Sequence, residues 1–323
     1  MEFILWNKKE FDKIYNCTGI NINDIPIKQR QYPIAAIICI ILGFIYYPLY
    51  FPCIYSFWKN KSKNPCYIIL IYLSILDIGT LWVPTIAYGI MSLNGVVYCS
   101  SPIFTYFVGC VLLFFWAAEC SADLILGINR CIEMAFPNIA KILFHGYRIS
   151  IWIIFSNLYG LYWLLFNHPY IFNGITFEVL FDPLIGYRPF RAEIFKKTLL
   201  EFTIHNTILA IGSPIIYARE LSNRVTKEEK MVFIQVFIIS MFNTSAGIAY
   251  AYNMNNEDHG ILPLMIAHFS WLHIHGKVSS IQTDTKILIK KYIFFIKTMQ
   301  NKTSPTNNWL TNNNQNTQNI IAQ

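Results

Sequence analysis

Long runs of apolar residues, separated by short polar segments, dominate the chain. A helix needs about 20 mostly apolar residues to cross the hydrocarbon core of a bilayer. Six runs meet that length, at residues 32–58, 65–91, 102–128, 149–170, 199–219 and 231–253. A seventh run, at 260–276, has only 17 residues and carries three histidines. The pattern therefore predicts seven transmembrane helices.

The charged residues between these runs are distributed unevenly. The segments after the first, third, fifth and seventh runs are basic, and segment 59–63 alone has three lysines and no acid. The segments after the second and sixth runs, 94–101 and 254–259, have no lysine or arginine. Because Lys and Arg concentrate in cytoplasmic loops, we expect the N-terminus outside and the C-terminus inside. An even number of spans would break this alternation, so the charges support the seventh run.

Composition narrows the class of protein. Hydrophobic residues make up 54% of the 323 residues and charged residues 13%, against about 25% charged residues in soluble domains. A soluble fold of this size has no means of burying so much apolar surface. The sequence therefore predicts an all-α polytopic protein of the lipid bilayer, and it excludes a soluble enzyme or a disordered regulator. The net charge of +7 belongs to the inner loops, so we expect no nucleic-acid partner.

The polar segments at the two ends complete the predicted organisation. Residues 1–31 hold nine charged side chains and no long apolar stretch, so we expect an extracellular arm without a signal peptide. Its Asn16-Cys17-Thr18 sequence makes Asn16 a candidate for glycosylation. The seven-helix domain then covers 32–276. We expect a basic amphipathic segment on the cytoplasmic side at 277–300 and a disordered Asn/Gln-rich tail at 301–323.

Two of the eight cysteines fall in segments predicted to lie outside the cell. They are Cys17, in the arm, and Cys99, just before the third run. An oxidising exterior makes them a candidate disulfide, and two free thiols are the alternative. The other six lie within or at the inner ends of the runs, where cysteine packs as a small apolar residue.

Acidic residues inside the predicted spans form a candidate polar cluster. Glu119 and Asp123 are four residues apart in the third run, and Arg130 follows seven residues later. This spacing places them on one side of a helix, and the cost of a charge in lipid directs that side toward the bundle interior. Asp77 of the second run is a further candidate for the cluster, and an ordinary interhelical hydrogen bond is an equal alternative for it.

No pattern in the chain indicates catalysis. The sequence has no Walker loop, GxSxG, HExxH or Gly-rich dinucleotide turn, so we expect neither an enzyme nor a cofactor. The histidines of the seventh run lack a matching acid or thiol cluster, so no metal site is expected. For an extracellular ligand, position alone suggests Tyr106 and Phe202 among the outer halves of the spans; the alternative for each is a packing or lipid-facing aromatic.

Several motifs of the chain resemble those of the nematode serpentine receptor class T family of chemoreceptors. They are Ile14-Tyr15-Asn16-Cys17 before the first run, Gly95-Val96-Val97-Tyr98-Cys99-Ser100-Ser101-Pro102 before the third, Asn129-Arg130-Cys131 at its end, and Leu143-Phe144-His145-Gly146-Tyr147-Arg148 before the fourth. The resemblance covers about residues 11–276. It implies a seven-helix receptor fold, a chemosensory function through a heterotrimeric G protein, and a place in the plasma or ciliary membrane.

The same resemblance implies roles for residues at the cytoplasmic side. Asn129 and Arg130 stand where rhodopsin-like receptors have an acid and an arginine, so a restraint on Arg130 has to come from elsewhere, for which Glu228 and Glu229 are candidates. The basic residues expected to meet the G protein with them are Arg219, Arg224, Lys227 and Lys230.

The chain departs from the family after His275-Gly276, where the family's His-Gly-x-Pro-Ala-x-Ile-Tyr stretch is lost. A receptor relic with an impaired seventh helix is therefore one alternative function. The other is a non-signalling transporter or scaffold, in which Asp77, Glu119 and Asp123 serve a proton or cation path.

Overall fold

The computed structural model describes residues 1, 5–62, 64–220 and 265–272 of the 323. The chain divides into two compact units, 1–282 and 283–323, and the described residues all belong to the first. The predicted sixth span, the basic segment 277–300 and the tail 301–323 lie outside the described residues.

The described helices follow the predicted spans closely. Four are long and apolar enough to cross a membrane: Pro33–Asn60, Cys66–Leu93, Pro102–Glu133 and Gly146–Phe166. They correspond to α3 (Pro33–Asn60), α4 with α5 (Cys66–Trp82 and Tyr88–Leu93), α6 (Pro102–Ala135) and α8 (Ile149–Phe166). The fifth predicted span lies within α9 (Ala192–Glu220), and residues 265–272 of the seventh are helical.

Shorter elements connect and cover these helices. The arm contains α2 (Lys8–Ile14) and two 3-10 turns, Ile22–Asp24 and Ile27–Gln29. A third 3-10 turn, Tyr98–Ser100, precedes α6, and α7 (Pro137–Phe144) with the turn Gly146–Arg148 joins α6 to α8. Between α8 and α9, the strands β1 (Ile171–Asn173) and β2 (Glu178–Leu180) form an antiparallel hairpin.

Proline shapes the helix between α4 and α5. Pro84 has no N–H to donate to the preceding turn, and residues Val83–Ala87 form a π-helical turn there instead of α-helix. Thr85 donates its hydroxyl to the carbonyl of Leu81 at 2.6 Å. The second span is therefore continuous but locally unwound, as expected where proline interrupts a helix in a membrane.

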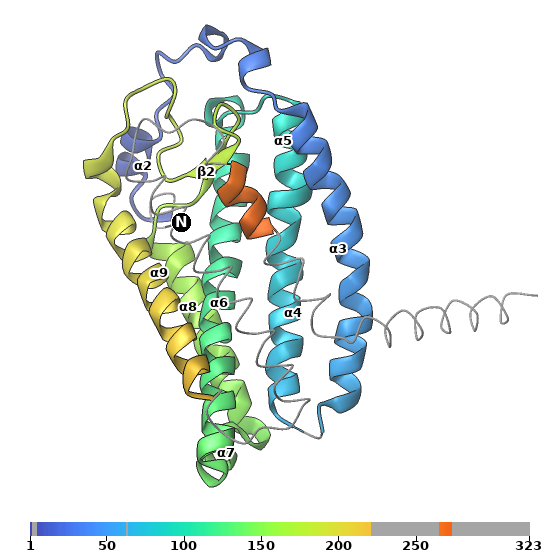
Figure 1. The fold of residues 1–323 in the computed structure, drawn as a ribbon. Helices are drawn as coiled ribbons and strands as arrows, with labels where there is room; N and C mark the ends of the chain where they lie inside the picture. Colours follow the sequence, from blue (N-terminus) through green and yellow to red (C-terminus); the bar gives the residue numbers. More distant parts are fainter. Residues whose placement is uncertain (2–4, 63, 221–264, 273–323) are drawn as a thin grey trace, which may run out of the picture. The chain divides into compact units, whose positions relative to one another are not determined.

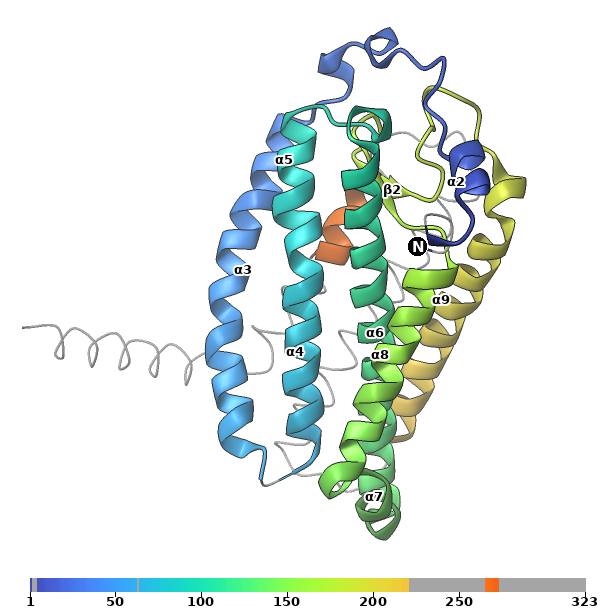
Figure 2. The same cartoon turned by 180° about the vertical axis from the view of Figure 1, so that it is seen from behind.

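The helix α6 lies at the centre of the bundle, with α4 on one side and α8 and α9 on the other (Figures 1 and 2). Small residues allow the close approach to α8. A Cβ built on Gly160 would lie 2.8 Å from the carbonyl oxygen of Phe114 and 3.1 Å from the Cβ of Ala118. Such contacts are typical of helix pairs in membranes, where packing rather than the hydrophobic effect drives association.

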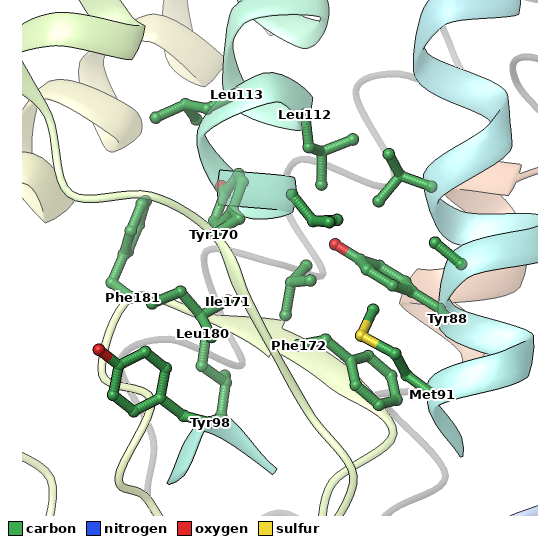
Figure 3. Packing of buried hydrophobic residues seen from close by; sticks show 14 of the residues in the cluster. Tyr88, Met91, Tyr98, Leu112, Leu113, Tyr170, Ile171, Phe172, Leu180 and Phe181 are labelled. Carbon is green, nitrogen blue, oxygen red and sulfur yellow. The ribbon is translucent and has the colours of Figure 1, made fainter. Parts of the chain in front are cut away.

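Buried side chains form two apolar clusters, one in the outer half of the bundle and one in the inner half. The outer cluster joins α5, α6 and the hairpin; Figure 3 shows Tyr88 and Met91 facing Phe172 and Leu112. Large apolar side chains are also exposed along the helices, among them Phe44 and Leu158. A bilayer explains this exposure, because lipid tails cover such a surface at no cost.

Candidate functional site

The outer end of the bundle is closed by the hairpin. Its register pairs Phe172 with Val179 and Asn173 with Glu178, and all six strand residues are buried. Asn173 donates from its side-chain amide to the carbonyl of Ile185 at 2.9 Å and accepts from the N–H of Ile175, also at 2.9 Å. These bonds fix the turn and the following loop, so the hairpin forms a rigid cover over the core beneath it.

The N-terminal arm is fastened to this cover and to α6. A disulfide joins Cys17 to Cys99 with an S–S distance of 2.10 Å, which connects the arm to the turn before α6. Tyr187 donates its hydroxyl to the carbonyl of Ile22 at 2.9 Å, and Arg188 donates to the carbonyl of Thr18 at 3.0 Å. The arm, the hairpin loop and the start of α6 thus form one assembly, which we call the outer cap.

Arg191 is the main polar centre of the outer cap. Its Nε and Nη2 donate to the two carboxylate oxygens of Asp182 at 3.0 and 2.5 Å, while Nη1 donates to the carbonyl of Ile14 at 2.8 Å. The side chain of Asp182 is fully buried. A bidentate pair of this kind has directional as well as electrostatic strength, so it holds α2 against the loop that leads to α9.

A second polar contact joins the arm to the end of α8. The hydroxyl of Tyr15 and the Nδ1 of His168 are 2.8 Å apart, and both residues are buried. Burial, together with nearby positive charges, lowers the pKa of His168 to about 4. The ring is therefore neutral at physiological pH, which suits a hydrogen bond to a tyrosine under an apolar cover.

The two aromatic residues proposed for the ligand site lie in the outer core, in separate surroundings. Tyr106 is fully buried, with ring centres 5.2 Å from Phe11 and 5.1 Å from Tyr15, so it packs against the arm. Phe202 packs instead against Trp116, at 5.6 Å, and Tyr170, at 5.7 Å. The structure thus places both under the outer cap and gives them different neighbours.

One buried ionisable contact extends from the cap into the bundle. Glu178 of β2 lies 3.7 Å from Nδ1 of His268, in the helix 265–272, and the Sγ of Cys39 in α3 lies 3.7 Å from the Nε2 of the same ring. This group was not predicted from the sequence, because Cys39 and His268 are 229 residues apart in the chain. The carboxylate and the thiol meet opposite nitrogens, so the histidine bridges three elements.

The acidic residues of the predicted polar cluster lie in and beside the inner part of the bundle. Asp77 and Glu119 are buried, and Asp123, one turn further along α6, is half-buried. Thr80 donates its hydroxyl to Glu119 at 3.2 Å, and Tyr50 of α3 interacts with both buried acids. Thr80 and Tyr50 are not predicted by the sequence pattern, and their hydroxyls are polar partners for these acids inside the bundle.

The inner end of α6 carries the arginine singled out by its motif. Arg130 pairs with Glu133 at 3.6 Å, and Asn64, just before α4, donates to the same carboxylate at 2.6 Å. The neighbouring Asn129 is buried. Within the described residues, the acid that restrains Arg130 is therefore Glu133 of its own helix.

The remaining predicted positions fall at the surface or outside the structure. Asn16 is exposed, and its side chain accepts from the N–H of Thr18 at 2.7 Å. Arg219 lies in the last turn of α9. The positions outside the described residues are Arg224, Lys227, Glu228, Glu229 and Lys230.

Comparison with known proteins decides the family. The family profile described as "Serpentine type 7TM GPCR chemoreceptor Srt" matches residues 1–304. The chain belongs to this serpentine receptor class T family. It is also 24% identical, over 222 residues, to "Serpentine receptor class T-55" of Caenorhabditis elegans, an alignment that covers 64% of this chain and 60% of that protein.

As a member of this family, the chain has a seven-transmembrane fold and is a multipass protein of the plasma membrane. The chain spans less than two thirds of the length of its curated relative. In the orientation predicted from the loop charges, the outer cap faces the cell exterior and Arg130 faces the cytoplasm.

Proposed function

We propose that this class T protein is a chemosensory G-protein-coupled receptor. It binds an extracellular small molecule or peptide in the outer half of the bundle and signals to a heterotrimeric G protein, at the plasma membrane or in a sensory cilium. The family assignment supports a receptor, and the buried aromatic core beneath the outer cap supports a ligand site of mainly apolar character.

The observation that carries this proposal is the contact set at the inner end of α6. Glu133 forms an ion pair with Arg130 of its own helix at 3.6 Å, and its other carboxylate oxygen accepts a hydrogen bond from Asn64, just before α4. An arginine held in this way is available to another partner only after the contact opens. A ligand that binds better to the open form shifts the population toward it, and Arg130 then meets the G protein.

Neutralising Arg130 tests the proposal. We expect Arg130→Gln to abolish G-protein activation in a reporter cell and to leave surface expression largely intact. Lys59→Gln removes an exposed positive charge from the last turn of α3, and it serves as the matched control with normal activation. Glu133→Gln weakens the restraint, so basal activation should rise.

Unchanged activation by Arg130→Gln would contradict the coupling mechanism. Ion flux into proteoliposomes that hold the purified chain, lost in Asp77→Asn, would favour the transporter instead.

A further inference from the structure

A groove lies at the outer end of α6, the end that Figure 2 shows in front and beside α5. Its volume is about 670 Å³. The residues that line it are Ser100, Ser101, Pro102, Ile103, Phe104 and Phe107. The last four belong to the third predicted span, and in the orientation predicted from the loop charges they lie in the outer leaflet. The groove therefore opens to lipid, and we call it the outer groove.

The apolar side chains of the outer groove are left uncovered by the protein itself. Ile103 is 78% exposed, and Phe104 and Phe107 are each 53% exposed. Thr105 and Tyr106, which lie between them in the sequence, are buried in the bundle. One face of the first turns of α6 is thus turned outward. A large exposed apolar surface of this kind marks a place where another molecule binds, and the surrounding bilayer supplies a lipid.

The two serines give the outer groove a polar end. Ser101 is the N-cap residue of α6, a position where a serine hydroxyl usually accepts from the first turn of the helix. Here the side chain makes no such capping bond. The hydroxyl of Ser100 accepts from the N–H of Val97 at 3.3 Å and keeps its proton for another acceptor. Both hydroxyls can therefore bind one further polar group at the membrane surface.

The charges around the outer groove limit the lipid. None of the residues that line it is charged, and the segment 94–101 before the helix has neither a basic nor an acidic residue. The phosphate of a phospholipid would find no lysine or arginine here, and a headgroup ammonium would find no carboxylate. A single uncharged hydroxyl, in contrast, both donates to and accepts from a serine hydroxyl. The pattern therefore favours a lipid whose only polar group is a hydroxyl.

We propose that the outer groove binds a sterol of the outer leaflet. The sterol hydroxyl lies at the two serines, and the fused rings pack on Ile103, Phe104 and Phe107. Fused rings lose little conformational entropy when they are held in one place, whereas the acyl chains of a phospholipid lose much of their rotamer freedom. The sterol site is separate from the proposed ligand site in the bundle and does not depend on coupling to a G protein.

Photo-crosslinking tests which lipid occupies the outer groove. The purified full-length chain is placed in phosphatidylcholine nanodiscs that contain either a photoreactive cholesterol or a photoreactive phosphatidylcholine, and the labelled peptides are identified by mass spectrometry. We expect the cholesterol probe to label the segment 100–107 preferentially, and an excess of cholesterol to remove this label. The phosphatidylcholine probe should label the exposed helices without preference for this segment.

A stereoisomer of cholesterol tests the contact with the serines on the native chain. Epicholesterol differs from cholesterol only in the direction of its hydroxyl. We expect it to compete with the cholesterol probe about three- to tenfold less well, the effect of losing one hydrogen bond. Ser101→Ala should weaken the competition by cholesterol to a similar extent and leave that by epicholesterol almost unchanged.

Two substitutions of exposed apolar residues separate the outer groove from the general lipid surface. Phe104→Ala removes a ring on which the sterol packs, so labelling of the segment should fall by about tenfold. Leu158→Ala removes an exposed apolar side chain of α8, outside the groove, and should keep the labelling. If Phe104→Ala does not fold, the competition between the two sterols on the native chain still decides.

Three results would each overturn the sterol site. They are labelling by the cholesterol probe that is spread evenly over the helices, a preference of the phosphatidylcholine probe for the segment 100–107, and unchanged labelling in Phe104→Ala. Equal competition by cholesterol and epicholesterol would remove the role of the serines and with it the argument for a sterol. Because neither an agonist nor a G protein is present, none of these results bears on the Arg130 test.

Discussion

Single residues of the outer cap make the stability of the receptor depend on pH. The folded-state pKa of His168 is about 4, below its ordinary value of 6.5, because the ring is buried and lies near positive charges. Between these values the unfolded chain binds a proton more readily than the folded chain. The contribution of His168 to stability is therefore complete above about pH 6.5 and is lost as the pH falls, by about 1.4 kcal/mol per unit.

We expect the Tm of the purified receptor to fall between pH 6.5 and pH 4.5 for this reason. In His168→Phe, which cannot titrate at this position, the fall should be smaller. The measurement is a set of thermal unfolding curves of both proteins at several pH values in one detergent. Parallel curves for the two proteins would assign the pH dependence to other groups.

For single residues, the sequence predicted a contact only where the chemistry of the residue type limits what it can do in its compartment. Cysteines in outer segments are restricted by the oxidising exterior, which is why Cys17 and Cys99 stood out. The contacts of Tyr15 with His168 and of Glu178 with His268 could not be predicted from the sequence. Tyr15 and His168 are 153 residues apart, and no local sequence pattern indicates a contact between residues so distant in the chain.

Among the elements, the contact between α6 and α8 depends on Gly160. A methyl group there would meet the carbonyl oxygen of Phe114 at 2.8 Å, closer than packed atoms tolerate. We expect Gly160→Ala to lower the free energy of unfolding by about 1–3 kcal/mol, the usual cost of overpacking. Leu158→Ala, at an exposed position of the same helix, should change it much less. Thermal unfolding in nanodiscs compares the two, and equal losses would show that Gly160 is not a contact point.

The disulfide between the arm and α6 gives a second prediction for the elements. Cross-linking positions 82 residues apart restricts the unfolded chain, an effect of about 2–4 kcal/mol for typical disulfides. We expect the double variant Cys17→Ser, Cys99→Ser to unfold at a lower temperature and to expose the arm to protease. Cys131→Ser, which removes a half-buried thiol that is outside the disulfide, is the control. An arm equally resistant in both proteins would contradict the role assigned to the bond.

Hydrophobicity predicted the membrane-spanning helices well and their ends less well. The fourth run was expected to reach residue 170, but α8 ends at Phe166, because the apolar residues after it are buried in the outer cap instead of in lipid. The helix α9 begins at Ala192, seven residues before the apolar run, since its charged first turns need no bilayer. The hairpin was not predicted: its strands have three residues each and are buried on both sides, so they show no alternation.

For the whole molecule, the orientation in the membrane is the central prediction. An exterior N-terminus exposes Asn16 to the glycosylation machinery, and the cationic loops stay in the cytosol. We expect the chain expressed in animal cells to lose mass on glycosidase treatment, and Asn16→Gln to migrate at the mass of the treated chain. A tag at the N-terminus should be stained on intact cells, and one at the C-terminus only after permeabilisation. Both tags on one side would contradict an odd number of spans.

The architecture of the molecule was accessible from the sequence because lipid imposes simple rules on length and charge. Those rules predicted the class of fold and the orientation of the chain in the membrane, and the motifs around Cys99 and Arg130 indicated the family. They contain no information on which side chains meet inside the bundle. Contacts such as that between Glu133 and Asn64 depend on how the helices are rotated and placed against one another, which the apolar pattern leaves open.

The bond between Cys17 and Cys99 also has a consequence for biosynthesis. Cys17 is synthesised first, and Cys99 reaches the endoplasmic reticulum lumen only after the first two helices have been inserted. If the first helix inserted with its N-terminus in the cytosol, Cys17 would stay in a reducing compartment. Cys99 would then have no cysteine to pair with. The bond therefore forms only in a chain whose first helices have inserted in the predicted orientation.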